Sequence, residues 1–201
     1  MEIINLKPHH KNKATKVLAA AFFNYPMFAF YFPDVKKRTK YLPWYLGNVL
    51  NCALRYGAVY TTPDVAGVIF TLPPGHTRIS QWEYIQNGFL LTSLVMGLRD
   101  FQQSNFCEEF VGNIHEELMK NRPHVYLWGL VVDPAQKAKG IGTALLQPVL
   151  AKADEQKMPV YLETHDENNV AYYQKHGFNL IRSDRIPKYN LPIWCMVREP
   201  I

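Results

Sequence analysis

The chain is poor in cysteine, in blocks of like charge and in long apolar runs. Its only cysteines are Cys52, Cys107 and Cys195, an odd number at wide spacing without a CxxC pair. This pattern argues against a disulfide framework or a structural zinc site and predicts a reducing, cytoplasmic environment. A single Cys52–Cys107 disulfide stays open as an alternative. The histidines include no HxH or HxxxH pair, so we predict no metal site.

The longest apolar stretches, 18–23 and 89–98, are shorter than the roughly 20 residues that a membrane span requires. Residues 1–8 lack a charged segment followed by a long apolar core, so we expect no secretory signal. Lys and Arg total 22 against 17 Asp and Glu, a net charge of +5 without any long run of like charge. This modest basicity suits an anionic ligand, and we expect neither a nucleic-acid nor a membrane partner.

The composition, 48% hydrophobic and 19% charged, is that of a globular protein, and the length predicts a single domain over residues 1–201. Residue periodicity predicts helices over 11–23, 36–56, 81–100, 104–121, 139–156 and 169–175, and strands over 2–6, 58–61, 65–72, 124–132, 160–163, 178–182 and 193–197. The strand–helix–strand order from 124 to 163 predicts a parallel strand pair joined by a crossover helix.

A glycine-containing turn follows the most apolar predicted strand. Residues 137–143, Lys-Ala-Lys-Gly-Ile-Gly-Thr, open the next predicted helix. Backbone N–H groups at a helix start lack intrahelical partners and favour phosphate oxygens, and glycines permit a close approach. The turn is no P-loop, because Gly142 and Thr143 have no Lys between them, and it departs from a dinucleotide fingerprint, which needs glycine where Leu145 stands.

A second segment, Asn169…Tyr173…Gly177-Phe178, follows the next predicted strand. Taken with the loop 137–142, which stands where an [RQ]xxGx[GA] loop would be, residues 124–182 resemble the GNAT acyl-CoA acyltransferase superfamily. Lys137 replaces the usual Arg or Gln of that loop. The segment from Leu162 to Tyr173 is also faintly similar to the branch that contains puromycin acetyltransferase.

The resemblance implies an α/β fold of the α+β type. It would have a mixed, mostly antiparallel sheet, a parallel β-α-β unit for acetyl-CoA, and helices on both faces. The helical stretch 76–122 departs from the short turn that many members have between the third and fourth strands. Gly129 is expected to mark the strand bulge of the family, with relief of crowding beside Trp128 as the alternative.

The resemblance also implies a set of acetyl-CoA-binding residues. Val131 and Val132 would offer backbone groups to the pantetheine arm. Asn169 would help to hold the cofactor, with the alternative that it caps the short helix, and Asn168 is a further candidate for either role. The diphosphate would lie on the backbone amides of Lys137, Ala138, Lys139, Gly140, Ile141, Gly142 and Thr143.

Two residues are implied to be catalytic. By its place in the pattern, Tyr173 matches the general acid of the family. A tyrosine suits this role because its pKa of about 10 keeps it protonated at neutral pH, so that it can donate to a departing thiolate. Its alternative is an ordinary packing aromatic. Glu163, at the end of the 160–163 strand, is the candidate base for the attacking amine, and its alternative is an exposed or ion-paired strand end. Asp133 is expected to form a turn with Pro134.

The resemblance implies an acetyl-CoA-dependent N-acetyltransferase that acts on an amine of a small molecule by direct attack in a ternary complex, with acetyl-CoA as cosubstrate and no metal. The aromatic run between Phe22 and Phe32 is either an acceptor pocket or core. A protein N-terminal or lysine acetyltransferase, a non-catalytic CoA-binding regulator and a nucleotide-binding module remain alternatives. A homodimer is compatible with the sequence, which leaves the oligomeric state open.

Overall fold

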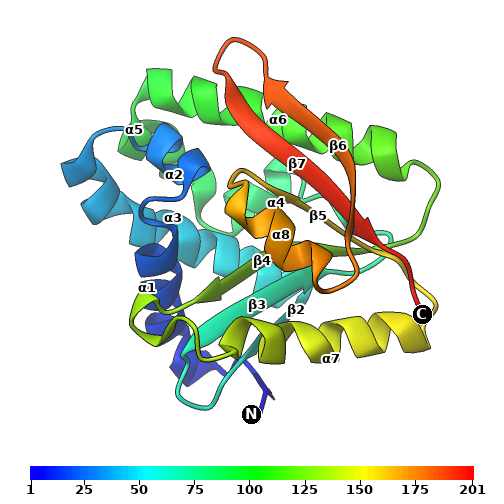
Figure 1. Ribbon diagram of the computed structural model, residues 1–201. Helices are drawn as coiled ribbons and strands as arrows, with labels where there is room; N and C mark the ends of the chain where they lie inside the picture. The colour runs from blue at the N-terminus through cyan, green and yellow to red at the C-terminus, as the bar shows by residue number, and fades with distance from the viewer.

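The computed structural model describes every residue from 1 to 201, and Figure 1 shows its course. The helices are α1 (Lys11–Phe22), α2 (Pro26–Tyr31), α3 (Val35–Tyr56), α4 (Gln81–Gln86), α5 (Thr92–Met96), α6 (Leu98–Met119), α7 (Ile141–Glu155) and α8 (Asn168–Gln174). The strands are β1 (Ile4–Asn5), β2 (Ala58–Thr61), β3 (Gly67–Leu72), β4 (Val125–Val132), β5 (Val160–Thr164), β6 (Asn179–Ile186) and β7 (Leu191–Arg198). None of the helices combines the length and the apolar content needed to cross a bilayer.

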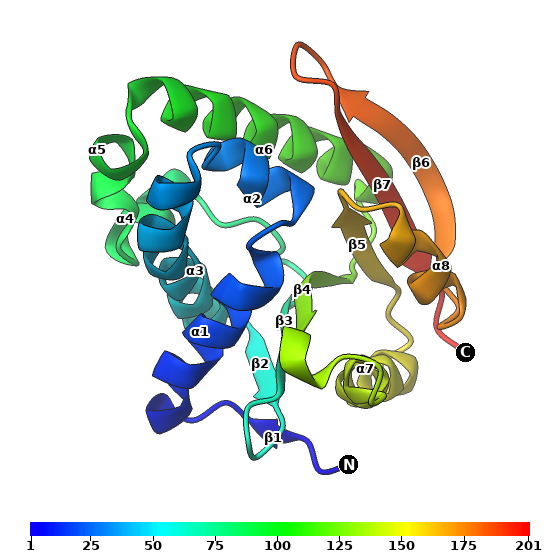
Figure 2. The same cartoon turned by 60° about the vertical axis from the view of Figure 1, so that its left-hand side comes forward.

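All the strands belong to one sheet in the order β1-β2-β3-β4-β5-β7-β6. Neighbouring strands are antiparallel except β4 and β5, which run parallel and are connected by α7. The predicted mixed sheet with a parallel β-α-β unit is therefore confirmed. β4 and β5 pair only at Val125 with Val160 and at Tyr126 with Tyr161. Beyond these pairs the two strands separate, as Figure 2 shows, and residues 127–132 have no strand partner on that side.

Helices cover both faces of the sheet because each strand alternates its side chains between two apolar clusters. One cluster joins α1, α2, α3 and α6 to inward residues such as Phe70, Tyr126 and Tyr161. The other joins α7 and α8 to the opposite face, including Leu127 and Leu162. Residues on the two faces can therefore reach the opening between β4 and β5 from opposite sides.

The expected irregularity in β4 is present. Phe70 of β3 stands opposite Gly129, while Thr71 stands opposite Leu127, so Trp128 is an additional residue in β4. A Cβ atom at Gly129 would come within 2.2 Å of the Phe70 ring. The crowding that requires glycine here comes from Phe70 rather than from Trp128.

The prediction for residues 76–122 was wrong in its first half. The single helix expected over 81–100 is instead α4, a 3₁₀ turn and α5, followed by the start of α6 at Leu98 rather than at residue 104. The breaks fall at Gly88 and Gly97, whose φ angles of 104° and 89° lie in a region that glycine adopts readily. The short helix α2 was not predicted; Pro26 begins it, in the first-turn position that proline favours.

Two further features connect the elements. The Arg198 guanidinium of β7 donates to both carboxylate oxygens of Asp154 in α7, at 2.7 and 2.8 Å, so the last strand is fastened to the crossover helix. All three cysteines are buried free thiols, so the alternative of a Cys52–Cys107 disulfide is wrong.

Candidate active site

The loop between β4 and α7 presents a row of unpaired backbone amides. Asp133 forms the expected turn, since its carboxylate accepts from the Ala135 amide at 2.9 Å. From Lys137 to Thr143, no backbone N–H donates a hydrogen bond within the protein, and the first helical bond runs from Ala144 to the Gly140 carbonyl. An ordinary helix leaves about four such donors, so the preceding loop lengthens the row. Such a row, at the positive end of α7, suits a diphosphate.

The two loop glycines differ in what surrounds them. Gly140 has φ 74°, and a Cβ atom there would meet nothing within 4 Å. A Cβ atom at Gly142 would lie 3.0 Å from the Tyr172 hydroxyl oxygen. Gly140 therefore sets the backbone direction at the start of α7, whereas Gly142 makes room for α8.

A pocket of about 410 Å³ borders this loop. Gln136, Lys139 and Ile141 line one side of it, and the turn 62–66 with the first two residues of the chain lines the other. The Lys139 ammonium donates to the Gln136 side chain at 2.7 Å, so one of the two loop cations is held beside the amides. The residues that the resemblance assigned to a diphosphate are thus compatible with one.

Val131 and Val132 lie on the part of β4 that has lost its β5 neighbour. On the other side they pair with Val68 and Gly67 of β3. Their strand therefore has one open edge, which is the kind of edge that an extended ligand can join through main-chain hydrogen bonds.

The short helix α8 packs against the start of α7. The Thr143 hydroxyl and the His176 ring nitrogen Nε2 lie 3.3 Å apart, and the buried Tyr172 hydroxyl has no hydrogen-bond partner. Tyr173 is 9% exposed and packs on Phe178, with ring centroids 5.5 Å apart. Burial raises the pKa of Tyr173 well above its ordinary value, so its hydroxyl keeps its proton at neutral pH.

Asn169 does not cap α8. The N-cap position belongs to Glu167, and the Asn169 side chain donates to the Thr164 hydroxyl at 3.0 Å instead. Asn168 bonds locally to Asp166 through both its amide groups. The alternative that Asn169 is a cap is therefore wrong, and its side chain ties α8 to the end of β5.

Glu163 is enclosed on the sheet face opposite α8. One of its carboxylate oxygens, Oε1, accepts from the Tyr126 hydroxyl of β4, and the other, Oε2, is buried without a partner. It forms no ion pair, so the alternative of an ion-paired strand end is wrong. Burial raises its pKa to about 8. A carboxyl group with this pKa can accept a proton near neutral pH.

Tyr25 connects the two sides of this region and was not singled out as a site residue from the sequence. Its hydroxyl lies 3.1 Å from the Thr164 hydroxyl and accepts from the His165 amide at 2.7 Å. Burial raises the pKa of Tyr25 to about 12. Tyr25 was part of the predicted aromatic run, but a contact across some 140 residues leaves no local sequence signal.

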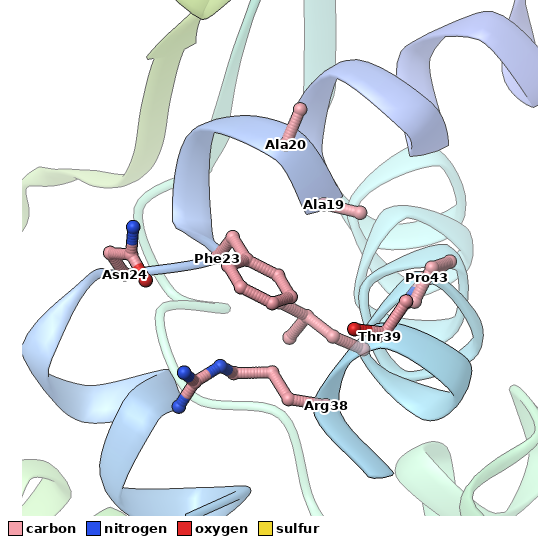
Figure 3. A pocket seen from close by; sticks show the side chains of 8 residues that line it. Ala19, Ala20, Phe23, Asn24, Arg38, Thr39 and Pro43 are labelled. Carbon is pink, nitrogen blue, oxygen red and sulfur yellow. The ribbon is translucent and has the colours of Figure 1, made fainter. Parts of the chain in front are cut away.

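A second pocket, of about 360 Å³, lies between α1 and α3 (Figure 3). The Phe23 ring stacks over the Arg38 guanidinium, 4.8 Å away, and Arg38 also donates to the Phe32 carbonyl. The pocket touches neither the loop 137–143 nor Glu163, so it is separate from the residues described above. The structure contains no cluster of three or more His, Cys, Asp or Glu side chains placed to hold a metal ion.

The splayed strands β4 and β5 and the unpaired amides at the start of the connecting helix α7 lie at one opening of the sheet. Comparison with known proteins identifies the class to which this fold belongs. The sequence model of the acetyltransferase (GNAT) family matches residues 105–178, and the chain carries a GNAT acetyltransferase domain.

The similarity to known proteins covers nearly the whole chain. An uncharacterized N-acetyltransferase of Schizosaccharomyces pombe is 24% identical over 198 residues, which cover 94% of this chain and 79% of that protein. A structure of histone acetyltransferase HPA2 and related acetyltransferase from Corynebacterium glutamicum has a TM-score of 0.68 at 16% identity, covering 99% of this chain and 96% of that one. Arylalkylamine N-acetyltransferase 2 from Aedes aegypti has a TM-score of 0.62 at 12% identity, covering 98% of both chains.

Proposed function

We propose that this protein transfers an acetyl group from acetyl-CoA to the amine of a small molecule, by direct attack in a ternary complex. The observation that carries the proposal is the meeting of two features at one opening in the sheet. The unpaired amides from Lys137 to Thr143 lie at the end of β4. Glu163, a carboxyl group with a pKa of about 8, lies at the end of β5.

Acetyl-CoA would supply the activated acyl group as a thioester. The amides of 137–143 would bind its diphosphate, with Lys137 and Lys139 adding positive charge. Val131 and Val132 would bind the pantetheine arm along the open edge of β4, and Asn169 would support it from α8. The relatedness to a family of acetyltransferases and the pocket beside Lys139 support this assignment.

Two side chains would move the protons. Glu163 would accept a proton from the substrate ammonium group, and the freed lone pair of the nitrogen forms the new C–N bond while the C–S bond breaks. The nitrogen then releases its second proton to solvent, and Tyr173 would donate its proton to the departing sulfur and recover one from solvent. The balance is one protonated amine and one thioester consumed, and one amide, one thiol and one proton formed. General acid and base steps of this kind each contribute roughly 10²–10⁴ in rate.

Thiol release tests the proposal directly. Acetyl-CoA is incubated with the protein and a panel of amines that includes alkylamines, arylalkylamines and short peptides, and the products are weighed by mass spectrometry. We expect thiol release that depends on the amine, together with a product heavier by one acetyl group. Transfer to peptides alone would indicate a protein acetyltransferase. Acetyl-CoA binding without release on any amine would indicate a regulator.

We further propose that residues 1–201 act as one acyltransferase domain in the cytoplasm, with a small-molecule amine as the partner. The continuous sheet from β1 to β6 and the free state of all three cysteines support this.

A further inference from the structure

A second glutamate lies near Glu163 and plays no part in the proposed proton transfers. Glu108 is on α6, within the helical stretch 76–122. In many members of the family that resembles this chain, a short turn stands in place of this stretch. The hydroxyl of Tyr31, in α2, donates to its Oε1 at 2.9 Å. Tyr31 is fully buried, so it holds the Glu108 carboxylate in one place. Glu108 itself is exposed, which leaves its second oxygen open to a ligand.

The fold brings Glu108 and Glu163 to the same end of the structure. His115, about two helical turns after Glu108 on the same face of α6, stacks on Tyr161 of β5 with ring centroids 4.2 Å apart. α6 leads back into β4 and runs roughly against it, while β5 runs parallel to β4 (Figure 1). Moving from His115 to Glu108 therefore leads in the same direction as moving from Tyr161 to Glu163. The two carboxylates are close enough for the charge of Glu108 to help raise the pKa of Glu163.

Neither carboxylate has a cation in this protein. The chain contains 22 Lys and Arg residues, yet none forms an ion pair with Glu108 or Glu163. The neighbouring Tyr161 is fully buried and its hydroxyl has no hydrogen-bond partner, as is also true of Glu163 Oε2. Two carboxylates without counter-charge, beside unsatisfied buried oxygens, favour a ligand that brings positive charge and hydrogen-bond donors.

Tyr31, which donates to Glu108, belongs to a group of aromatic side chains. It packs on Phe28 with ring centroids 6.0 Å apart, and Phe106, two residues before Glu108 on α6, packs on Tyr189 at 5.6 Å. Aromatic side chains beside a carboxylate can contact an alkyl chain and attract ammonium groups. A single ammonium ion would neutralise only one of the two glutamates, whereas a dication would neutralise both.

We infer that the acceptor is a primary amine that carries a second positive charge, and that Glu108 binds this second charge while Glu163 serves the reacting amine. The inference rests on the proposed function and specifies its substrate class as small aliphatic diamines. Glu108 would then be a specificity-determining residue, which contacts the substrate away from the reacting atoms.

Matched amines test the inference. Thiol release from acetyl-CoA is measured with alkyl diamines of three to eight carbons, with monoamines of the same lengths, and with amino acids in which a carboxylate replaces the second amine. We expect at least one diamine to exceed its monoamine in kcat/KM by about tenfold or more, and the amino acids to be the poorest acceptors. A charge-assisted hydrogen bond to a carboxylate is sufficient for a factor of this size.

The variant Glu108→Gln keeps the shape and removes the charge. It should lower kcat/KM for the diamine by about tenfold, mainly through KM, and leave the monoamine within about twofold. Glu109→Gln is the matched control, because Glu109 is an exposed neighbour on the same helix without an ion pair. It should leave both amines unchanged. Equal diamine and monoamine rates, or the same loss for both in Glu108→Gln, would overturn the inference while the proposed function stands.

A binding measurement separates the two proposals. Calorimetric titration of the CoA-loaded protein with the same diamines and monoamines needs no turnover. If diamines bind more tightly than monoamines and Glu108→Gln abolishes the difference, the inference is supported, even if no amine gives thiol release. The absence of thiol release with every amine would contradict the proposed function alone. Diamine binding no tighter than monoamine binding in the titration overturns the inference whatever the rates show.

Discussion

The Nε2 atoms of His115 and His124 lie 2.7 Å apart, in a buried hydrogen bond between α6 and the start of β4. His124 Nδ1 lies 2.7 Å from the Arg122 carbonyl oxygen and therefore donates to it. In a neutral ring this leaves His124 Nε2 as the acceptor and His115 Nε2 as the donor. Burial lowers the pKa of both rings, that of His115 to about 3. Protonation of His124 at Nε2 would break the bond that fastens α6 to the sheet.

This pair predicts a loss of stability in mild acid. In the unfolded chain both imidazoles take up a proton as the pH falls through about 6.5, whereas in the folded protein they stay neutral. Keeping the His115 ring neutral therefore costs nothing above pH 6.5, and the free energy of unfolding falls as the pH drops below that value towards the folded pKa of about 3. For His115 the loss is about 1.4 kcal/mol at pH 5.5. The lowered pKa of His124 changes stability in the same direction. Urea unfolding at pH 7.5 and 5.5 measures the difference.

The variant His115→Gln can still donate to His124 but does not titrate. Its free energy of unfolding should fall by about 1.4 kcal/mol less than that of the parent chain over the same pH interval. His9→Gln is the control, because His9 is exposed, and it should reproduce the parent's pH dependence. An unaltered dependence in His115→Gln would show that the ring is charged in the folded protein.

Gly140 and Gly75 offer a matched pair for testing the loop. Both have positive φ, 74° and 82°, and a Cβ atom at either would meet nothing within 4 Å. Substitution by Ala should cost each about 1 kcal/mol of stability through backbone strain. Only Gly140→Ala should also weaken CoA binding, by about tenfold, because it disturbs the amides of the loop. Calorimetric titration with CoA checks this, and equal affinities of the two variants would show that the diphosphate lies elsewhere.

The loop could be predicted from the sequence because its properties are local. A buried strand, a turn at Asp133 and glycines at 140 and 142 fix the open amides without help from the rest of the chain. The parallel strand pair followed from the strand–helix–strand order within the same short region, whereas Tyr173 was assigned by the resemblance of its segment to a known family. The loop and the strand pair depend on backbone geometry and on neighbours a few residues away.

The acceptor side could not be predicted in this way. The contact between Tyr31 and Glu108 joins residues 77 apart, and that between Tyr126 and Glu163 joins residues 37 apart. The residues next to Glu163 in the sequence do not indicate that its carboxylate will be buried without a cation. The break of the predicted helix 81–100 at Gly88 and Gly97 depended on backbone angles that periodicity does not reveal.

Tyr173→Phe should leave CoA binding intact and lower kcat by roughly 10²–10⁴, because it removes the proton donor and keeps the packing against Phe178. Tyr172→Phe is the adjacent control. Its hydroxyl is buried without a partner, so its loss should leave kcat within a few fold and should not destabilise the protein. Steady-state kinetics and CoA titration of both variants check this prediction. A normal kcat in Tyr173→Phe would remove the general acid role from this residue.

We expect the variant Glu163→Gln to have opposite effects on activity and on stability. Because its pKa is raised to about 8, kcat/KM should rise with pH until the carboxyl is ionised near that value. Glu163→Gln should lower kcat by roughly 10²–10⁴ and remove this limb of the profile. Gln can still accept from Tyr126, so the structural contact remains.

The sign of the stability change follows from the same pKa. The unfolded carboxyl ionises near pH 4.3, but the folded one resists ionisation until about pH 8, so this group destabilises the fold increasingly as the pH rises between those values. Glu163→Gln should therefore unfold at a higher urea concentration than the parent at pH 7.5 and at nearly the same concentration at pH 4.5. If Glu163 is a proton acceptor buried without a counter-charge, its replacement by a neutral amide removes the cost of burying that charge and should stabilise the protein. A Glu163→Gln variant that loses both activity and stability at pH 7.5 would instead show that Glu163 has a structural role.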